Sequence, residues 1–300
     1  MLLLLAYVLL FPLFFVLPLA GLLAASRPTT LREWAWIAAA MLWLSLSLVS
    51  PGGLASQMLL AWALFLTGAF ALLMLSGQRR LVPGALLAAL GSLGAAAGWT
   101  WWLGTRWEEI QFAVTQMGWE ARRELLAQAA LDPARMASVR TLVDALADGF
   151  RLMAQLFPAL LILVSLPGLA LAWAWYHRLA ARPVGQVAEL FAEFRFNDQL
   201  IWLVVVSVAL LVLPVPEPIG SLAGNLAVVT GGLYAARGAA IIWGSIESFP
   251  LPILVMIAIG VVLILPVALG AVFALGLADT WVDFRRRFKP ADTEGRAPWK

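Results

Sequence analysis

Residues 54–77 read LASQMLLAWALFLTGAFALLMLSG, a stretch without a single charged side chain. An α-helix rises about 1.5 Å per residue, so ~20 consecutive apolar residues are enough to cross the hydrocarbon core of a bilayer. Such a helix is apolar on all of its faces, whereas a helix on the surface of a soluble domain keeps one polar face. The stretch is therefore predicted to be a membrane-spanning helix.

The same pattern recurs along the chain. Spans are expected near residues 2–25, 34–49, 54–77, 81–104, 157–180, 200–216, 219–244 and 251–278. Their number is seven or eight, because the glycine-rich segment 219–248 can also be interpreted as a re-entrant segment that does not cross. The predicted fold class is all-α: a polytopic transmembrane helical bundle forming a single membrane domain over residues 1–284.

The overall composition agrees with a surface that faces lipid. The chain is 63% hydrophobic and 12% charged, whereas soluble domains are about half apolar and about a quarter charged. It has no Cys and a single His, so we expect no metal site, haem or other cofactor. The small net charge of +3 gives no reason to expect nucleic acid as a partner.

Residues 105–157 differ from the rest because charged side chains are frequent there. Two amphipathic helices outside the membrane are expected over 107–156. The second has apolar residues at steps of three and four, which form a stripe on one face: Met136, Val139, Val143, Leu146, Phe150 and Met153. This stripe is interpreted either as a docking surface or as a face packed on the sister helix or the membrane. Residues 285–300 are expected to be a basic, partly disordered tail.

Arg237 is the clearest functional candidate, because an ionisable residue within a membrane segment is costly and usually has a role. One hypothesis places Asn225, Tyr234 and Arg237 around an anionic or polar ligand. The alternative is a tightly packed helix in which Arg237 reaches the interface or pairs with a carboxylate.

Polar residues also flank two of the expected spans. Arg195, Asn197 and Asp198 precede the span near 200, and Asp279 and Asp283 close the last one. Asp279 and Asp283 are four residues apart and so share one helix face, from which they can pair with Arg195 or Arg237. We interpret these residues as an interfacial polar cluster rather than as ligand contacts.

Small residues recur at helical spacing in two spans. Gly220, Gly224, Gly231 and Gly238 are spaced by four and seven residues, and Gly94 and Gly98 lie in the span near 81–104. Glycines on one face allow another helix to approach closely. These positions are predicted to be helix-packing sites.

Motifs of hydrolases and nucleotide-binding proteins are absent from the sequence. There is no phosphate-binding glycine loop followed by Lys and Ser or Thr, and no His-Glu-x-x-His or Ser-x-x-Lys pattern. We therefore expect that the chain is not an enzyme and has no catalytic residues.

The C-terminal third resembles the YybS-like family of bacterial membrane proteins. The likeness is carried by residues 194–202 (FRFNDQLIW), by residues 224–229 (GNLAVV) with Tyr234 and Gly238 after them, and by residues 276–286 (GLADTWVDFRR). Asp198 and Trp202 match the family pattern, whereas Asn197 stands where a Pro is expected.

That family is distantly similar to the substrate-binding subunits of energy-coupling-factor vitamin transporters. The resemblance implies a protein of the bacterial inner membrane that captures a small solute and works with a partner membrane subunit and ATPases. The alternative is a structural or scaffold subunit of a membrane or envelope assembly, with 107–156 as its contact region.

Overall fold

The computed structural model describes residues 7–8, 10–49, 54–77, 80–129, 139, 143, 149–246, 250, 252–253, 256, 260–261 and 264–282. Several predictions lie outside these residues: the beginnings of the spans near 2–25 and 251–278, most of the second amphipathic helix, Asp283 and the basic tail. The chain divides into two compact units, Met1–Ala188 and Glu189–Lys300. Each unit is described by itself.

All regular structure in the described residues is helical, and this confirms the predicted fold class. Five of these helices are long and apolar enough to cross a membrane: Ser56–Ser76, Leu81–Trp102, Phe157–Leu179, Glu217–Ser245 and Leu265–Val282. Two further apolar helices, Leu13–Ala25 and Asp198–Val212, are shorter. Together they form a helical membrane bundle.

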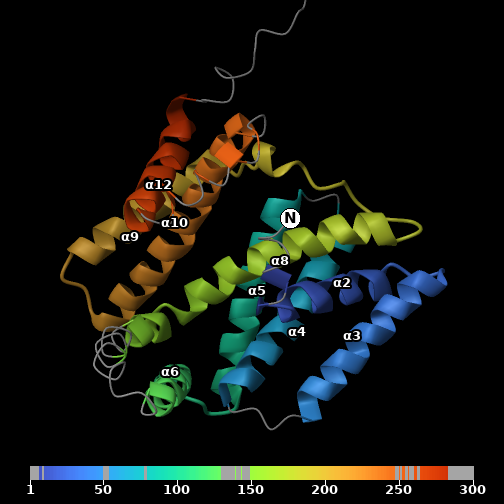
Figure 1. Ribbon diagram of the computed structural model, residues 1–300, viewed down its shortest axis with the longest axis horizontal. Helices are drawn as coiled ribbons and strands as arrows, with labels where there is room; N and C mark the ends of the chain where they lie inside the picture. The colour runs from blue at the N-terminus through green and yellow to red at the C-terminus, as the bar shows by residue number, and fades with distance from the viewer. Residues whose placement is uncertain are drawn as a thin grey trace, which may run out of the picture. The chain divides into compact units, whose positions relative to one another are not determined.

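The first unit is built around the contacts of one short central helix. Its helices are α2 (Leu13–Ala25), α3 (Leu31–Val49), α4 (Leu54–Ser76), α5 (Leu81–Trp102), α6 (Trp107–Ala129) and α8 (Phe157–Leu179). Helix α2 packs against α3, α4 and α8, and α5 packs against both α4 and α8 (Figure 1). Helix α6, the first of the two expected amphipathic helices, contacts α4.

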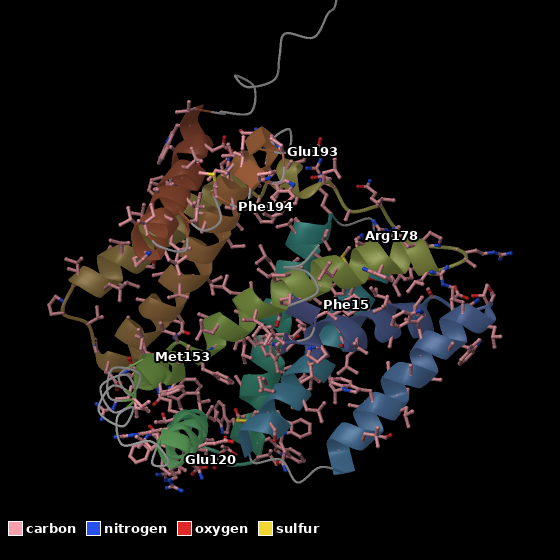
Figure 2. All side chains as sticks on the ribbon, viewed as in Figure 1. Phe15, Glu120, Met153, Arg178, Glu193 and Phe194 are labelled. Carbon is pink, nitrogen blue, oxygen red and sulfur yellow. The ribbon has the colours of Figure 1, made fainter. Side chains whose placement is uncertain are left out.

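Close approach of α2 and α8 depends on Gly168. A Cβ at this position would collide with the carbonyl oxygen of Phe14 and lie 2.6 Å from the hydroxyl of Tyr7. That hydroxyl donates a hydrogen bond to the carbonyl oxygen of Val164 at 2.6 Å. Further along the interface, Phe15 of α2 meets Trp175 of α8 edge-on, with ring centroids 6.2 Å apart (Figure 2 labels Phe15).

Helix α3 begins earlier than the sequence analysis placed it. The span was expected from residue 34, but the helix starts at Leu31, so Arg32 and Glu33 belong to its first turn. The reason is a capping box, in which two residues three apart hydrogen-bond to each other at the start of a helix. The Glu33 carboxylate accepts a hydrogen bond from the backbone N–H of Thr30 at 2.7 Å, and the backbone N–H of Glu33 donates one to the Thr30 hydroxyl at 3.4 Å. The signature Thr30-x-x-Glu33 is present in the sequence.

Three helices and two short 3-10 turns make up the described part of the second unit. They are η1 (Phe191–Glu193), η2 (Asp198–Leu200), α9 (Ile201–Val212), α10 (Glu217–Ile246) and α12 (Leu265–Val282). Helix α10 packs against both α9 and α12, and η1 also lies on α10 (Figure 1). Helix α10 is therefore the centre of this unit.

Proline positions set the ends of α9 and α10. Helix α9 ends at Val212, two residues before Pro214, because the residue before a proline is disfavoured in the helical region. Helix α10 then starts at Glu217, with Pro218 in its first turn, where a proline is well tolerated. At about 18 Å, α9 is shorter than a membrane span.

The segment around residues 219–248 is one uninterrupted helix as far as Ile246. Its length of about 45 Å exceeds the ~30 Å of a hydrocarbon core. A re-entrant segment would need a break that lets the backbone turn back, and α10 has none. By length and composition this helix can cross a membrane, and the choice between crossing and re-entry stays a prediction.

Candidate functional site

Arg237 lies on α10, where its side chain is only 3% exposed. The residue is about 30 Å along the helix from Glu217, toward the same end of the unit as the last turn of α12. A buried guanidinium in an apolar helix needs partners for its charge and for its N–H donors. The neighbouring elements supply both.

Two carboxylates bind Arg237 from different segments of the chain. The Nε–H donates to Oδ2 of Asp279 at 2.9 Å, and an Nη2–H donates to the backbone carbonyl oxygen of Asp279 at 3.2 Å. An Nη1–H donates to Oδ1 of Asp198 at 2.6 Å. We call Arg237, Asp198 and Asp279 the ionic cluster.

The two carboxylates differ in their exposure to solvent. Asp279 is buried on α12, whereas the side chain of Asp198, on η2, is 60% exposed. Breaking a buried ion pair leaves an uncompensated charge in a poorly polarisable environment, while an exposed pair contributes little. Asp279 is thus the fixed partner of Arg237, and Asp198 is the partner that water can replace.

The ring of Phe196 covers the guanidinium from the connector, which is the segment of residues 189–200 that leads into α9. The Phe196 ring lies 5.5 Å from the Arg237 guanidinium carbon, a distance at which the ring face attracts a cation. Phe196 also meets Tyr234 edge-on, with centroids 5.0 Å apart, and Tyr234 meets Phe273 of α12 at 6.4 Å. Phe196, which the sequence analysis did not select, is therefore part of the site.

Helices α10 and α12 can meet at this point because both have glycine there. A Cβ on Gly238 would collide with the carbonyl oxygen of Val272 and lie 3.0 Å from the amide nitrogen of Gly276. This contact is consistent with the packing role expected for Gly238. The glycine contact places Asp279, three residues after Gly276, beside Arg237.

Two buried hydroxyl groups lie at the same interface. The hydroxyls of Tyr234 and Thr280 are buried, and neither has a hydrogen-bond partner among the described residues. They lie near one another, but without the geometry of a hydrogen bond. A buried polar group without a partner costs about 1–3 kcal/mol, so native structures rarely leave one unexplained.

Not all of the expected site residues join this cluster. Asn225 is twelve residues before Arg237 on the continuous helix α10, about 18 Å along its axis. Its side-chain amide donates to the carbonyl oxygen of Ser221 at 2.9 Å. The structure thus brings Tyr234 to Arg237 but does not bring Asn225 there.

The expected interfacial cluster is assembled in part. Asp198 and Asp279 meet at Arg237, and Asn197 caps the η2 turn by accepting the backbone N–H of Gln199 at 3.0 Å. Arg195 is exposed on the connector. Asp283 lies outside the described residues.

The remaining glycines differ from Gly238. Among the described residues, nothing would come within 4 Å of a Cβ at Gly94, Gly98 or Gly231, and a Cβ at Gly220 would only touch Val215 at 4.0 Å. Gly224 is half-buried. A packing role for these five positions stays a prediction.

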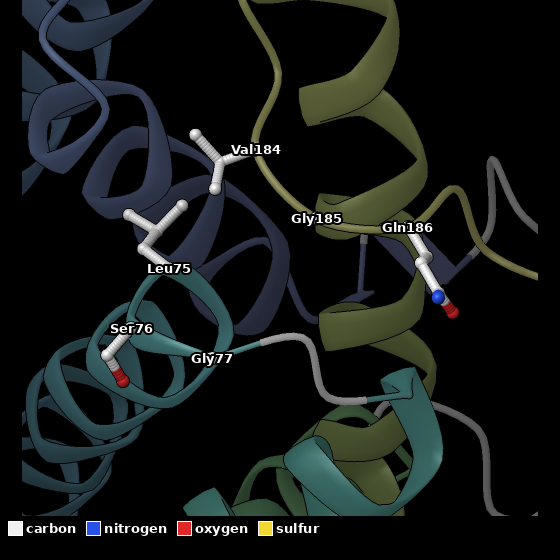
Figure 3. Close-up of a pocket in the computed structure, with 6 residues that line it drawn as sticks. All are labelled: Leu75, Ser76, Gly77, Val184, Gly185 and Gln186. Atoms are coloured by element: carbon white, nitrogen blue, oxygen red, sulfur yellow. The ribbon is translucent and has the colours of Figure 1, made fainter.

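The first unit contains a separate pocket that the sequence analysis did not anticipate. It has a volume of about 400 Å³ and lies between the end of α4 and the loop after α8 (Figure 3). Its lining residues are Leu75, Ser76, Gly77, Val184, Gly185 and Gln186.

The loop that lines this pocket is held by two aromatic side chains of α8. The Trp173 indole N–H donates to the carbonyl oxygen of Gln186 at 2.9 Å, and the Tyr176 hydroxyl accepts the backbone N–H of Val184 at 3.0 Å. Gly185 has φ +90°, a conformation that favours glycine. None of the six described lining residues is charged.

Within the described residues, no three His, Asp or Glu side chains come close enough to hold a metal ion. The site of the second unit is instead one cation held between two anions. Both carboxylates accept hydrogen bonds from Arg237.

The fold and this site define a class: a helical membrane protein with several apolar helices, in which a buried Arg237–Asp279 ion pair joins two of these helices. The chain belongs to the family described as predicted membrane protein (DUF2232), whose sequence pattern matches residues 1–280. No curated protein and no solved structure matches it.

Proposed function

We propose that the chain is a non-enzymatic, transport-type subunit of the bacterial inner membrane that captures a small anionic or polar solute. The observation that supports this proposal is Arg237, a buried cation in a membrane-spanning helix with one partner open to solvent. Charged residues in membrane helices commonly mark the path or the binding site of a solute.

The resemblance to the YybS-like family adds support. Its three stretches are 194–202, 224–229 with Tyr234 and Gly238 after them, and 276–286. They are separate in the sequence, yet each contributes to the surroundings of Arg237. Asp198 belongs to the first stretch, Tyr234 to the second and Asp279 to the third. The distant similarity to substrate-binding subunits of energy-coupling-factor transporters suggests partner ATPases and a further membrane subunit.

The partner proposal is tested by purifying the tagged full chain from its native membrane in mild detergent and identifying what copurifies by mass spectrometry. We expect two ATPases and a second membrane subunit. A preparation that yields only non-ATPase membrane proteins, or the chain alone, would contradict a transporter subunit of this kind.

Solute binding is tested on the purified chain by screening small metabolites for thermal stabilisation. Arg237→Ala is expected to abolish the response to any solute that stabilises the wild type. Arg182→Ala is the matched control, because Arg182 is exposed in the loop after α8. If Arg237→Ala still responds as the wild type does, the solute does not bind at this site.

A scaffold role is the second proposal, and one feature of α6 favours it. This charged helix exposes three large aromatic side chains, of which Phe112 at 69% and Trp119 at 54% are more exposed than Trp107. Exposed aromatic residues are common at the centres of protein interfaces. Stable copurification with envelope proteins that is lost on Phe112→Ser and Trp119→Ser would favour the scaffold over the transporter subunit.

A further inference from the structure

We propose that Asp198 occupies the place of the ligand's anionic group, and that a carboxylate or phosphate binds by displacing Asp198 from Arg237. This inference rests on the proposed capture of a solute and names its chemical class. In the structure Asp198 thus occupies the site, and the ligand competes with Asp198 for Arg237.

The first argument is the unequal burial of the two carboxylates. Asp279 holds Arg237 through both its side chain and its backbone carbonyl oxygen, and its side chain is fully buried. Asp198 makes one hydrogen bond, at 2.6 Å, with a side chain that is 60% exposed. Released from Arg237, Asp198 would be solvated by water, whereas Asp279 would remain as a buried charge.

The second argument is charge. The guanidinium of Arg237 is bound by two carboxylates, those of Asp198 and Asp279. An incoming anion that takes the position of Asp198 preserves the number of charges around Arg237, and the displaced carboxylate moves into solvent. A cationic or neutral ligand would leave Arg237 with one anionic partner fewer.

The third argument is the supply of donors. A carboxylate or phosphate oxygen accepts several hydrogen bonds. Displacement of Asp198 frees an Nη1–H of Arg237. The hydroxyls of Tyr234, on α10, and Thr280, on α12, are buried without hydrogen-bond partners among the described residues. The freed Nη1–H is one donor to the anion, and the hydroxyl of Tyr234, which lies close enough to Arg237 and Asp198 to interact with both charges, is a second.

The fourth argument is the segment that carries Asp198. Asp198 begins the three-residue 3-10 turn η2, and Phe196, two residues earlier, covers the guanidinium. One short segment thus provides both the competing charge and the aromatic cover. A shift of this segment alone uncovers Arg237, while the contacts between α10 and α12 stay in place.

The test uses the full chain in nanodiscs, with binding measured as thermal stabilisation. In one arm the lipid is neutral phosphatidylcholine, and inorganic phosphate or succinate is titrated. In the other arm the nanodiscs contain increasing phosphatidic acid and no soluble anion is added. The two arms separate a soluble anion from a lipid headgroup.

Asp198→Asn is the decisive variant, since it removes the competing charge and keeps the shape of the side chain. We expect the anion concentration that gives half of the maximal stabilisation to be about tenfold lower for Asp198→Asn than for the wild type. Without the competing carboxylate, a larger fraction of the molecules has Arg237 free to bind the anion. Glu193→Gln is the matched control: it removes one charge from the same connector, where Glu193 is exposed (Figure 2), and should leave the titration unchanged. Tyr234→Phe, which loses only a hydroxyl, should raise the half-maximal concentration several-fold.

Every outcome either supports or overturns the displacement of Asp198 by an anion. Tighter binding in Asp198→Asn supports the displacement; if it occurs only with phosphatidic acid, the anion is a lipid headgroup and the capture of a soluble solute is contradicted instead. Equal titrations for the wild type and Asp198→Asn overturn the displacement even if a solute binds. No response in either arm for both proteins overturns it as well.

Discussion

Gly276 of α12 lies directly against Gly238 of α10. A Cβ on Gly276 would be 2.8 Å from the Gly238 amide nitrogen and would collide with the carbonyl oxygen of Tyr234. Backbone therefore meets backbone at this crossing, as small residues permit in membrane helices. The contact matters for the site because Tyr234 and Arg237 approach α12 at this crossing.

Replacing Gly276 by Ala should destabilise the protein by about 1–3 kcal/mol or more, because the atoms nearest to the new Cβ are backbone atoms that cannot move aside alone. Gly270→Ala on the same helix is the control: nothing among the described residues lies within 4 Å of its Cβ position, and Ala is a better helix former than Gly. Thermal unfolding in detergent compares the two variants. Equal stability would show that α10 and α12 do not cross at this point.

Replacement by Asn should lower the stability of the protein much more at Asp279 than at Asp198. Asp279→Asn leaves Arg237 without its buried counter-charge and should cost about 3–5 kcal/mol. Asp198→Asn removes an exposed partner and should cost no more than about 1 kcal/mol. Unfolding monitored by denaturant or heat gives both values, and a larger loss for Asp198→Asn would contradict the assignment of Asp279 as the fixed partner.

The capping box at Glu33 predicts a dependence of stability on acid. Its pKa is lowered from 4.5 to about 2 by hydrogen bonds from the backbone N–H groups of Ala181, Thr30 and Thr29. Because the pKa is lower in the folded state, the stabilisation is present above the ordinary value of 4.5 and is lost as the pH falls through about 2.

Glu33→Gln should therefore be less stable than the wild type at neutral pH, and the difference in Tm should shrink as the pH falls below 4.5. Glu189→Gln, at an exposed position, controls for the loss of one carboxylate. A difference in Tm that stays constant from neutral pH down to about pH 2 would show that the charge of Glu33 is not what stabilises this end of α3.

Tyr176 should control the loop that lines the pocket of the first unit. Tyr176→Phe removes the hydroxyl that accepts the Val184 N–H at 3.0 Å, and a hydrogen bond of this kind contributes about 1 kcal/mol. Amide exchange at Val184 should then accelerate several-fold, up to about tenfold. Hydrogen–deuterium exchange measures this, with Arg178→Lys, at an exposed position of the same helix, as the control; unchanged exchange would contradict the contact.

Much of the helical layout could be read from the sequence, because an apolar run of sufficient length is a local property. The helices Leu81–Trp102 and Phe157–Leu179 agree with the expected spans to within two residues at each end. The start of α3 could also have been found, since Thr30-x-x-Glu33 is a recognisable signature. The expectation instead followed hydropathy, which treats Arg32 and Glu33 as loop residues.

The site was predictable only as a set of candidates. Arg237, Tyr234, Asp198 and Asp279 stand out as polar residues in or beside apolar segments, and a carboxylate partner for Arg237 was among the alternatives. The same reasoning grouped Asn225 with Arg237, because both are polar and lie in one segment. Helical geometry separates them by about 18 Å.

The sequence by itself determined that this protein is an all-helical membrane protein, since the length and polarity of each segment act locally and need no partner. Only the tertiary structure decided that Asp198 and Asp279, 39 and 42 residues from Arg237, share one guanidinium and differ in burial. That arrangement depends on which helix faces meet, and the meeting is set by the backbone contact at Gly238 and Gly276. Polar residues far apart in the chain become a site only when packing brings them within the reach of a hydrogen bond.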